Sequence, residues 1–193
     1  MMNRPIHKRK CVLVFGYEGK NNKTEKQYFS HFSLSDSEFI LKSFSTGVTD
    51  PRKMIASTKR KRARFDYRAD EDKTYIFIDG DDDHDKMKLI ESLRAKLKKH
   101  DKDITLIISN PCFELWFLNH FERFGHPLTK KHLFSTLNGF IPHYEKTMDV
   151  FQLTRKNMKK AIANSAFQLS LANDNPKTEV ALLLTNKVIK EKQ

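Results

Sequence analysis

Long apolar runs are missing from this sequence. No segment approaches the roughly 20 consecutive apolar residues that a membrane-spanning helix needs. The basic segment at residues 1–10 lacks the apolar stretch of a secretory signal peptide. Internal repeats and low-complexity segments are absent as well. We therefore expect a soluble protein that stays in the cytoplasm and has no membrane partner.

Cysteine is also scarce. The chain has two cysteines, Cys11 and Cys112, which lie within or beside apolar runs and form no CxxC pair. Two buried free thiols are typical of a reducing compartment. The eight histidines are scattered, so the pattern does not indicate a structural zinc site. Signatures of RRM, KH and zinc-finger domains are missing too, so no motif identifies a particular nucleic acid.

Positive charge is abundant. Lys and Arg outnumber Asp and Glu by 36 to 24, which gives a net charge of +12. Such a chain favours a polyanionic partner, because Lys and Arg neutralise phosphates and release counterions. The charge is densest over residues 52–64, and we expect DNA or RNA to be bound there; the alternative is a solvated basic face. The candidate nucleic-acid-binding residues are Lys59, Arg60, Lys61, Arg62 and Arg64.

Hydrophobic patterning predicts strands that alternate with helices. Runs rich in β-branched and aromatic residues predict strands at residues 11–15, 39–44, 74–78 and 104–108. Helices are expected at residues 24–32, after the N-cap Asp50, at 85–99 and at 110–121. This alternation predicts an α/β fold, with a mostly parallel sheet of about four strands and helices on both faces.

The strand signal disappears after residue 125. Residues 130–137, 151–171 and 177–190 are expected to be helices. The sequence thus predicts an α/β core over residues 1–125 and a helical C-terminal appendage over residues 126–193, packed on the core.

Acidic residues occur where the expected strands end. Glu18 follows the first strand, Asp79 and Asp81 follow the third, and Glu114 lies just beyond the fourth. The working site of an open α/β sheet lies outside the carboxyl ends of its strands, so these carboxylates are expected to meet. Close carboxylates repel one another, and a hard cation such as Mg²⁺ or Mn²⁺ removes that penalty. We therefore predict a metal held by Glu18, Asp79 and Asp81 that acts on phosphates.

Other interpretations of these acids stay open. The run at residues 79–85 could be a Ca²⁺ loop, although His84 and Ile90 replace the Gly and Glu that an EF-hand needs. Its later acids are better explained as a solvated loop in which Asp83 caps the next helix. Glu25 and Glu114 lie in first helical turns, where the helix dipole alone favours an acid.

Four stretches together resemble the RloB-like (AbiLii-type) family. They are EG…TE at residues 18–25, DGDD at 79–82, SNPCFELW at 109–116 and NP.TEV at 175–180. SNPCFELW is the specific string among them. Two departures stand out. Residues 18–25 are longer than the family's tight EGxxTE turn, so Glu25 joins Glu18 only if the loop folds back. Gly80 stands where Arg is frequent, which removes a positive charge.

The resemblance implies a compact Toprim-type fold, in which Glu18, Asp79 and Asp81 occupy the positions of the Toprim acids. Members of the family are often encoded beside an ATPase and are associated with phage resistance by abortive infection. An ATPase partner and a role in antiviral defence are therefore implied by the resemblance.

These features favour a Mg²⁺-dependent nuclease. Its candidate catalytic residues are Glu18, Asp79, Asp81, Glu25 and Glu114. One alternative is another phosphoryl-transfer enzyme, such as a nucleotidyltransferase or a primase-like protein, although the chain has no zinc module or separate nucleotide-binding motif. A further alternative is a non-catalytic subunit that binds nucleic acid or an ATPase. The sequence does not decide between DNA and RNA, or fix the oligomeric state.

Overall fold

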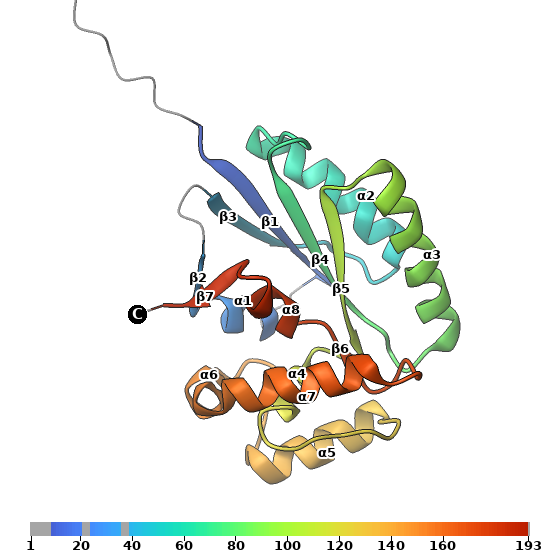
Figure 1. Cartoon of the computed structure of the whole chain (residues 1–193), viewed down its shortest axis with the longest axis vertical. Helices are drawn as coiled ribbons and strands as arrows, with labels where there is room; N and C mark the ends of the chain where they lie inside the picture. The colour runs from blue at the N-terminus through green and yellow to red at the C-terminus, as the bar shows by residue number, and fades with distance from the viewer. Residues whose placement is uncertain (1–8, 21–23, 36–38, 193) are drawn as a thin grey trace, which may run out of the picture.

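The centre of the protein is a five-stranded sheet in the order β3-β1-β4-β5-β6, seen in a computed structural model that describes residues 9–20, 24–35 and 39–192 (Figure 1). The strands β1 (Cys11–Tyr17), β3 (Phe39–Ser45), β4 (Lys73–Asp79) and β5 (Ile104–Asn110) are parallel. The short β6 (Lys177–Thr178) runs antiparallel to β5. The predicted α/β fold and its parallel strands are confirmed.

Two helices cover one face of the sheet. These are α2 (Pro51–Arg62) and α3 (His84–His100), whose apolar residues share one core cluster with β4 and β5 (Figure 1). Asp50 caps α2 by accepting a hydrogen bond from the Lys53 N–H at 2.9 Å. Asp83 caps α3 in the same way. Both predicted caps are confirmed, and they fix where each helix starts relative to the preceding strand.

The other face carries a larger, aromatic core. Phe15 of β1 lies between Phe29 and Phe77, with ring centroids 5.4 and 5.1 Å away in edge-on arrangements. Several helices pack on this face: α1 (Thr24–Phe29), α4 (Glu114–Leu118), α5 (Lys130–Phe140), α6 (Phe151–Thr154), α7 (Met158–Ser170) and α8 (Ala181–Thr185). The predicted coverage of both faces is therefore confirmed.

The segment after residue 125 is less helical than predicted. The prediction of a helix over residues 177–190 is wrong, because this stretch forms β6, α8 and β7 (Ile189–Glu191). β7 pairs with β2 (Phe32–Leu34) in a separate two-stranded sheet. Pairing with distant strands overrides the helical pattern here. The predicted helix at 151–171 is interrupted by a 3-10 turn, η2 (Arg155–Asn157). The C-terminal segment is thus joined to both sheets.

The helix predicted over residues 110–121 is also shorter than expected. Asn110 is the last residue of β5 and not a helix cap, and α4 begins only at Glu114. The Asn110 amide is used elsewhere, as described below. Across residues 9–20, 24–35 and 39–192, no helix combines the length and apolar character needed to cross a membrane.

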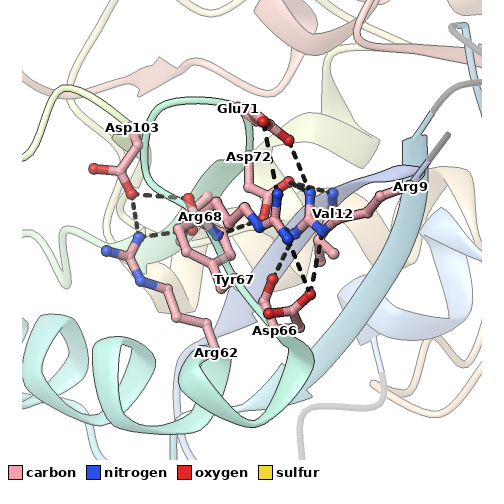
Figure 2. A network of polar contacts seen from close by, with 10 residues as sticks. Arg9, Val12, Arg62, Asp66, Tyr67, Arg68, Glu71, Asp72 and Asp103 are labelled. Carbon is pink, nitrogen blue, oxygen red and sulfur yellow. Dashed lines mark hydrogen bonds and ion pairs between the residues drawn. The ribbon is translucent and has the colours of Figure 1, made fainter.

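A polar network fastens the start of β4 to the start of β1 (Figure 2). Asp72 is fully buried and accepts hydrogen bonds from the Val12 N–H at 2.6 Å and the Arg68 N–H at 2.7 Å. Arg9 Nη2 lies 2.6 Å from the same carboxylate. These contacts satisfy a buried charge and hold the amino ends of two neighbouring strands together.

Candidate active site

The carboxyl ends of β1, β4 and β5 meet at one edge of the sheet, beside a cavity of about 470 Å³. The cavity is lined by both acids and cations. The acids are Glu18, Glu25, Asp79, Asp81 and Glu114, and the cations are Lys20, Lys130 and Lys146. The structure thus brings together all five acids that the sequence marks as catalytic candidates.

Backbone hydrogen bonds hold the two innermost strand-end acids in place. Glu18 Oε2 accepts a hydrogen bond from the Asp79 N–H at 2.9 Å, and Asp79 Oδ1 accepts one from the Phe113 N–H at 3.0 Å. Each carboxylate is therefore oriented by the chain beyond a neighbouring strand. Such rigid support is what a metal ligand or a catalytic base requires.

The electrostatics of these acids are unfavourable without a counter-charge. Burial raises the pKa of Asp79 well above its usual value, and the charges of Glu25, Glu114 and Glu18 raise it further. Burial also raises the pKa of Glu18, and Lys86 opposes that shift. A cation placed among these groups would remove their mutual repulsion.

Asp81 differs from the inner acids because lysines already contact it. Lys86 Nζ donates to Asp81 Oδ2 at 2.5 Å, and Lys130 donates to its other oxygen. Burial acts to raise the pKa of Asp81, but the hydrogen bonds from Lys130 and Lys86 outweigh it and lower the pKa. Asp81 is therefore a carboxylate that stays ionised beside two cations.

The acidic loop has a close backbone contact behind it. A Cβ atom added at Gly80 would lie 2.5 Å from Asn110 Cγ, so a side chain at this position would collide with Asn110. Asn110 Oδ1 in turn accepts the Asp82 N–H at 2.9 Å. The sequence gives no hint of this supporting role. Lys86 and Lys130 place two positive charges beside Asp81, one residue further along the chain.

Glu114 is the most deeply buried acid of the cavity, with a relative exposure of 2%. Its Oε1 lies 3.4 Å from the Tyr144 hydroxyl and 3.5 Å from Lys146 Nζ. Within the described ranges, its Oε2 has no hydrogen-bond partner. A buried carboxylate oxygen left in this state is costly, and a ligand in the cavity would satisfy it.

Glu25 reaches the same cavity despite the longer segment before it. It is 5% exposed, and its charge acts on Asp79. Thr24 Oγ1 donates to the Lys146 carbonyl at 2.8 Å, which fixes the start of α1 against the C-terminal segment. Glu25 and Glu18 therefore line the same cavity; residues 21–23, which lie between them in the chain, are outside the described ranges.

The donor set fits a hard divalent cation. No three Asp, Glu, His or Cys side chains of the described residues are already arranged to hold an ion. Mg²⁺ does not need such a cage, because it is bound by one or two carboxylates together with waters and substrate phosphates. The unsatisfied Glu114 oxygen and the repulsion around Asp79 both favour a cation in the cavity. The assignment of Glu18, Asp79 and Asp81 as its ligands remains a prediction.

The sequence matches the model of a known protein family over most of its length. A family model described as RloB-like protein matches residues 13–186. The chain belongs to the RloB-like family. The matched region contains every acid and lysine that lines the cavity. No curated protein and no solved structure matches the chain.

The cavity lysines of this RloB-like chain were missed by the sequence analysis. Lys130 lies in the first turn of α5, and Lys146 lies in the irregular segment between α5 and α6. Both belong to the part of the chain predicted to be an appendage. Single lysines in a basic sequence give no signal that would distinguish them from surface residues.

The structure corrects the assignment of Arg62 to nucleic-acid binding. Arg62 is buried, and its guanidinium donates to Asp103 Oδ2 at 2.5 Å and to Thr74 Oγ1 at 3.0 Å (Figure 2). Tyr67 completes this group, with its hydroxyl 2.8 Å from the same Asp103 oxygen. Arg62 therefore holds the end of α2 against the starts of β4 and β5, and it is removed from the candidate nucleic-acid-binding set.

The other members of the basic cluster differ in their contacts and exposure. Arg62 contacts the amino ends of strands whose carboxyl ends carry the acids, a separation of about 20 Å over a seven-residue strand. Lys59 is paired with Asp101 at 2.6 Å, and Lys61 donates to the Ser45 carbonyl at 2.5 Å. Among the five candidates, the exposed ones are Arg60 and Arg64.

The buried ion pair between Arg62 and Asp103 leads to a prediction about stability. We expect Arg62→Leu to lower the free energy of unfolding by about 3–5 kcal/mol, because Asp103 would be left buried and uncompensated. The exposed neighbour provides the control, since Arg60→Leu should change it by no more than about 0.5 kcal/mol. Urea unfolding measures both values. Equal stability of the two variants would contradict the structural role of Arg62.

Proposed function

We propose that this RloB-like protein is a metal-dependent nuclease that cleaves phosphodiester bonds in the cavity at the carboxyl edge of its sheet. The observation that carries the proposal is the mixed lining of that cavity, which contains five carboxylates and three lysines. Carboxylates suit a divalent cation, and lysines suit the phosphates of a polyanion. The net charge of +12 supports the same class of substrate.

Each group in the cavity has a chemical task in this proposal. Glu18, Asp79 and Asp81 would hold Mg²⁺ or Mn²⁺, and the ion would polarise the phosphate and lower the pKa of a water. Glu114 orients the attacking water and accepts its proton as the water oxygen bonds to phosphorus and the bond to the leaving oxygen breaks. Glu25, at the start of α1, acts mainly on substrate binding. Lys130 and Lys146 bind the phosphate oxygens, on which negative charge increases as the bond to the leaving oxygen breaks.

The cellular setting is part of the proposal and rests on the family. The family resemblance implies genes that are often encoded beside an ATPase and an association with phage resistance by abortive infection. We propose that this chain works in the cytoplasm in antiviral defence, with nucleic acid as substrate and an ATPase as partner.

A direct assay tests the activity. The purified protein is incubated with plasmid DNA, single-stranded DNA and tRNA, each with Mg²⁺, Mn²⁺ or EDTA. Cleavage of one substrate that requires the divalent ion is the expected result. Incorporation of labelled nucleotide without cleavage would instead identify a nucleotidyltransferase. If the protein binds nucleic acid but catalyses neither reaction, even when the proposed ATPase partner is added, it is a non-catalytic subunit.

The lysine role gives a second prediction. Lys146→Met should lower kcat/KM by about 10²-fold, because one cation that stabilises developing charge on the phosphate is lost. Lys131→Met removes the same charge from an exposed position outside the cavity lining, and it should leave cleavage nearly unchanged. Steady-state cleavage kinetics compare the two variants. Similar losses in both would mean that Lys146 contributes only to the general positive field.

A further inference from the structure

Over most of its length, the outer edge of β5 has no neighbouring strand among the described residues (Figure 1). β5 pairs with β4 from Ile104 to Ser109, whereas β6 covers only Ser109 and Asn110 on the other side. No other strand of the described residues borders this edge. An open edge presents backbone donors and acceptors to which another strand can be added.

Alternate residues of β5 direct their backbone groups to the open side. The carbonyls of Asp103 and Ser109 accept N–H groups of Thr74 and Gly80, on the β4 side. In a parallel ladder the backbone groups of successive residues point to opposite edges. Residues 104, 106 and 108 therefore face outward.

Part of this outward-facing row is unpaired. Both backbone groups of Ile108 are paired with Glu179. The Ile108 N–H donates to Glu179 Oε2 at 3.0 Å, and the Glu179 N–H donates to the Ile108 carbonyl at 2.9 Å. Arg94 Nη2 lies 3.3 Å from the Leu106 carbonyl. For the Leu106 N–H and the Ile104 carbonyl, the described part of the chain provides no partner. A donor and an acceptor on one strand edge match the backbone of an extended peptide.

A cleft of about 360 Å³ runs along the same stretch of β5. Leu97 of α3 and Leu182 of α8 contribute apolar side chains to its lining, and Lys98 and Lys102 add positive charge. Both lysines are exposed. The length from residue 104 to residue 108 leaves room for about four residues of an added strand. The cleft thus combines a backbone edge, apolar walls and a basic rim.

The charge of the rim selects among possible occupants. A second copy of this chain paired edge to edge would bring its own Lys98 and Lys102 toward the same residues here, which is repulsive. A nucleic acid matches the charge but offers no peptide backbone to the β5 edge. An extended peptide with acidic and apolar residues in alternation satisfies the backbone, the leucines and the lysines together.

We propose that this cleft binds an extended acidic segment of a partner protein as an added strand beside β5, in line with β6. Carboxylates of the segment pair with Lys98 and Lys102, and its apolar side chains contact Leu97 and Leu182. The added strand takes over the Leu106 carbonyl from Arg94, which keeps its 2.7 Å contact with Glu179. This binding is independent of the proposed nuclease activity.

A fluorescein-labelled peptide of alternating glutamate and valine is the probe, followed by anisotropy with the full-length protein. Saturable binding is expected. Replacing the central valine by proline removes a backbone donor and should weaken binding about tenfold. The double variant Lys98→Glu/Lys102→Glu should lose at least as much. Lys96→Glu, an exposed lysine on the same helix outside the cleft, should bind within about twofold of the native chain.

Hydrogen exchange gives a second measurement, because the Leu106 amide should exchange more slowly when the peptide is bound. Three results would overturn the proposal. These are the absence of saturable binding, equal affinity for the proline peptide, and an equal loss in Lys96→Glu. Dimerisation of the chain that protects the Leu106 amide without peptide would overturn the choice of occupant.

Discussion

Asp79→Asn is expected to abolish divalent-dependent cleavage, by about 10³-fold or more, while making the metal-free protein more stable. A folded-state pKa above the unfolded value means that folding stability falls as pH rises from the usual carboxyl range to that raised pKa. At neutral pH the Asp79 carboxylate therefore costs the fold free energy, and asparagine removes this cost. Its amide oxygen can still accept the Phe113 N–H, so the local geometry is kept.

Thermal unfolding and cleavage assays measure the two effects side by side. The native protein should gain stability with Mg²⁺, by about 2.7 kcal/mol when the ion is at 100 times its Kd, and Asp79→Asn should lose most of that gain. Asp85→Asn is the matched control, because Asp85 is an exposed acid of the same loop region that does not line the main cavity. A variant with full activity, or one whose stability falls in EDTA, would contradict the assignment of Asp79.

Glu18→Gln should reduce kcat by orders of magnitude, and it should lower kcat more than Glu25→Gln does. Glu18 is held by the Asp79 N–H and lies directly beyond β1, so it occupies a fixed position beside the metal ligands. Glu25 lies at the start of α1, where the helix N-terminus favours a phosphate of the substrate more than a cation. Loss of Glu25 is therefore expected to appear more strongly in KM.

Cleavage kinetics at saturating Mg²⁺ separate these two glutamates. Isothermal titration with Mn²⁺ adds a readout that does not depend on turnover, and Glu18→Gln should bind the ion more weakly than the native protein. If Glu25→Gln proves the more damaging change in kcat, the principal glutamate is the one on α1 and the ligand set must be redrawn around it.

The acids were predictable from sequence because their position follows from topology. Parallel strands end at one edge, so residues that follow β1, β4 and β5 must approach one another even when they are far apart in the chain. Correct strand boundaries were enough to predict the positions of Glu18, Asp79 and Glu114. The place of Glu25 in the cavity was harder to predict. The neighbouring Thr24 is anchored to the Lys146 carbonyl, more than a hundred residues away, and local sequence patterns carry no information on such a contact.

The burial of Arg62 could not be predicted, because clustering in the sequence does not show where a charge lies in the fold. Nucleic-acid binding by the other four candidates stays a prediction. Lys59 and Arg62 have counter-ions in Asp101 and Asp103, which the chain supplies from the loop before β5. The helix predicted over residues 177–190 was wrong for a different reason. Their strands are two and three residues long, and each exists only because β5 or β2 offers a partner. Pairing of that kind leaves no periodicity to detect.

The contact between Thr24 and Lys146 has a consequence for synthesis. The cavity is lined by Glu18, which follows β1, and by Lys146, which follows α5, so a nascent chain that stops between them carries an incomplete site. A fragment that ends before that point lacks Lys146 and therefore part of the cavity lining. Under the proposed function, such a fragment is expected to be inactive, so activity appears only after the chain beyond α5 has been made.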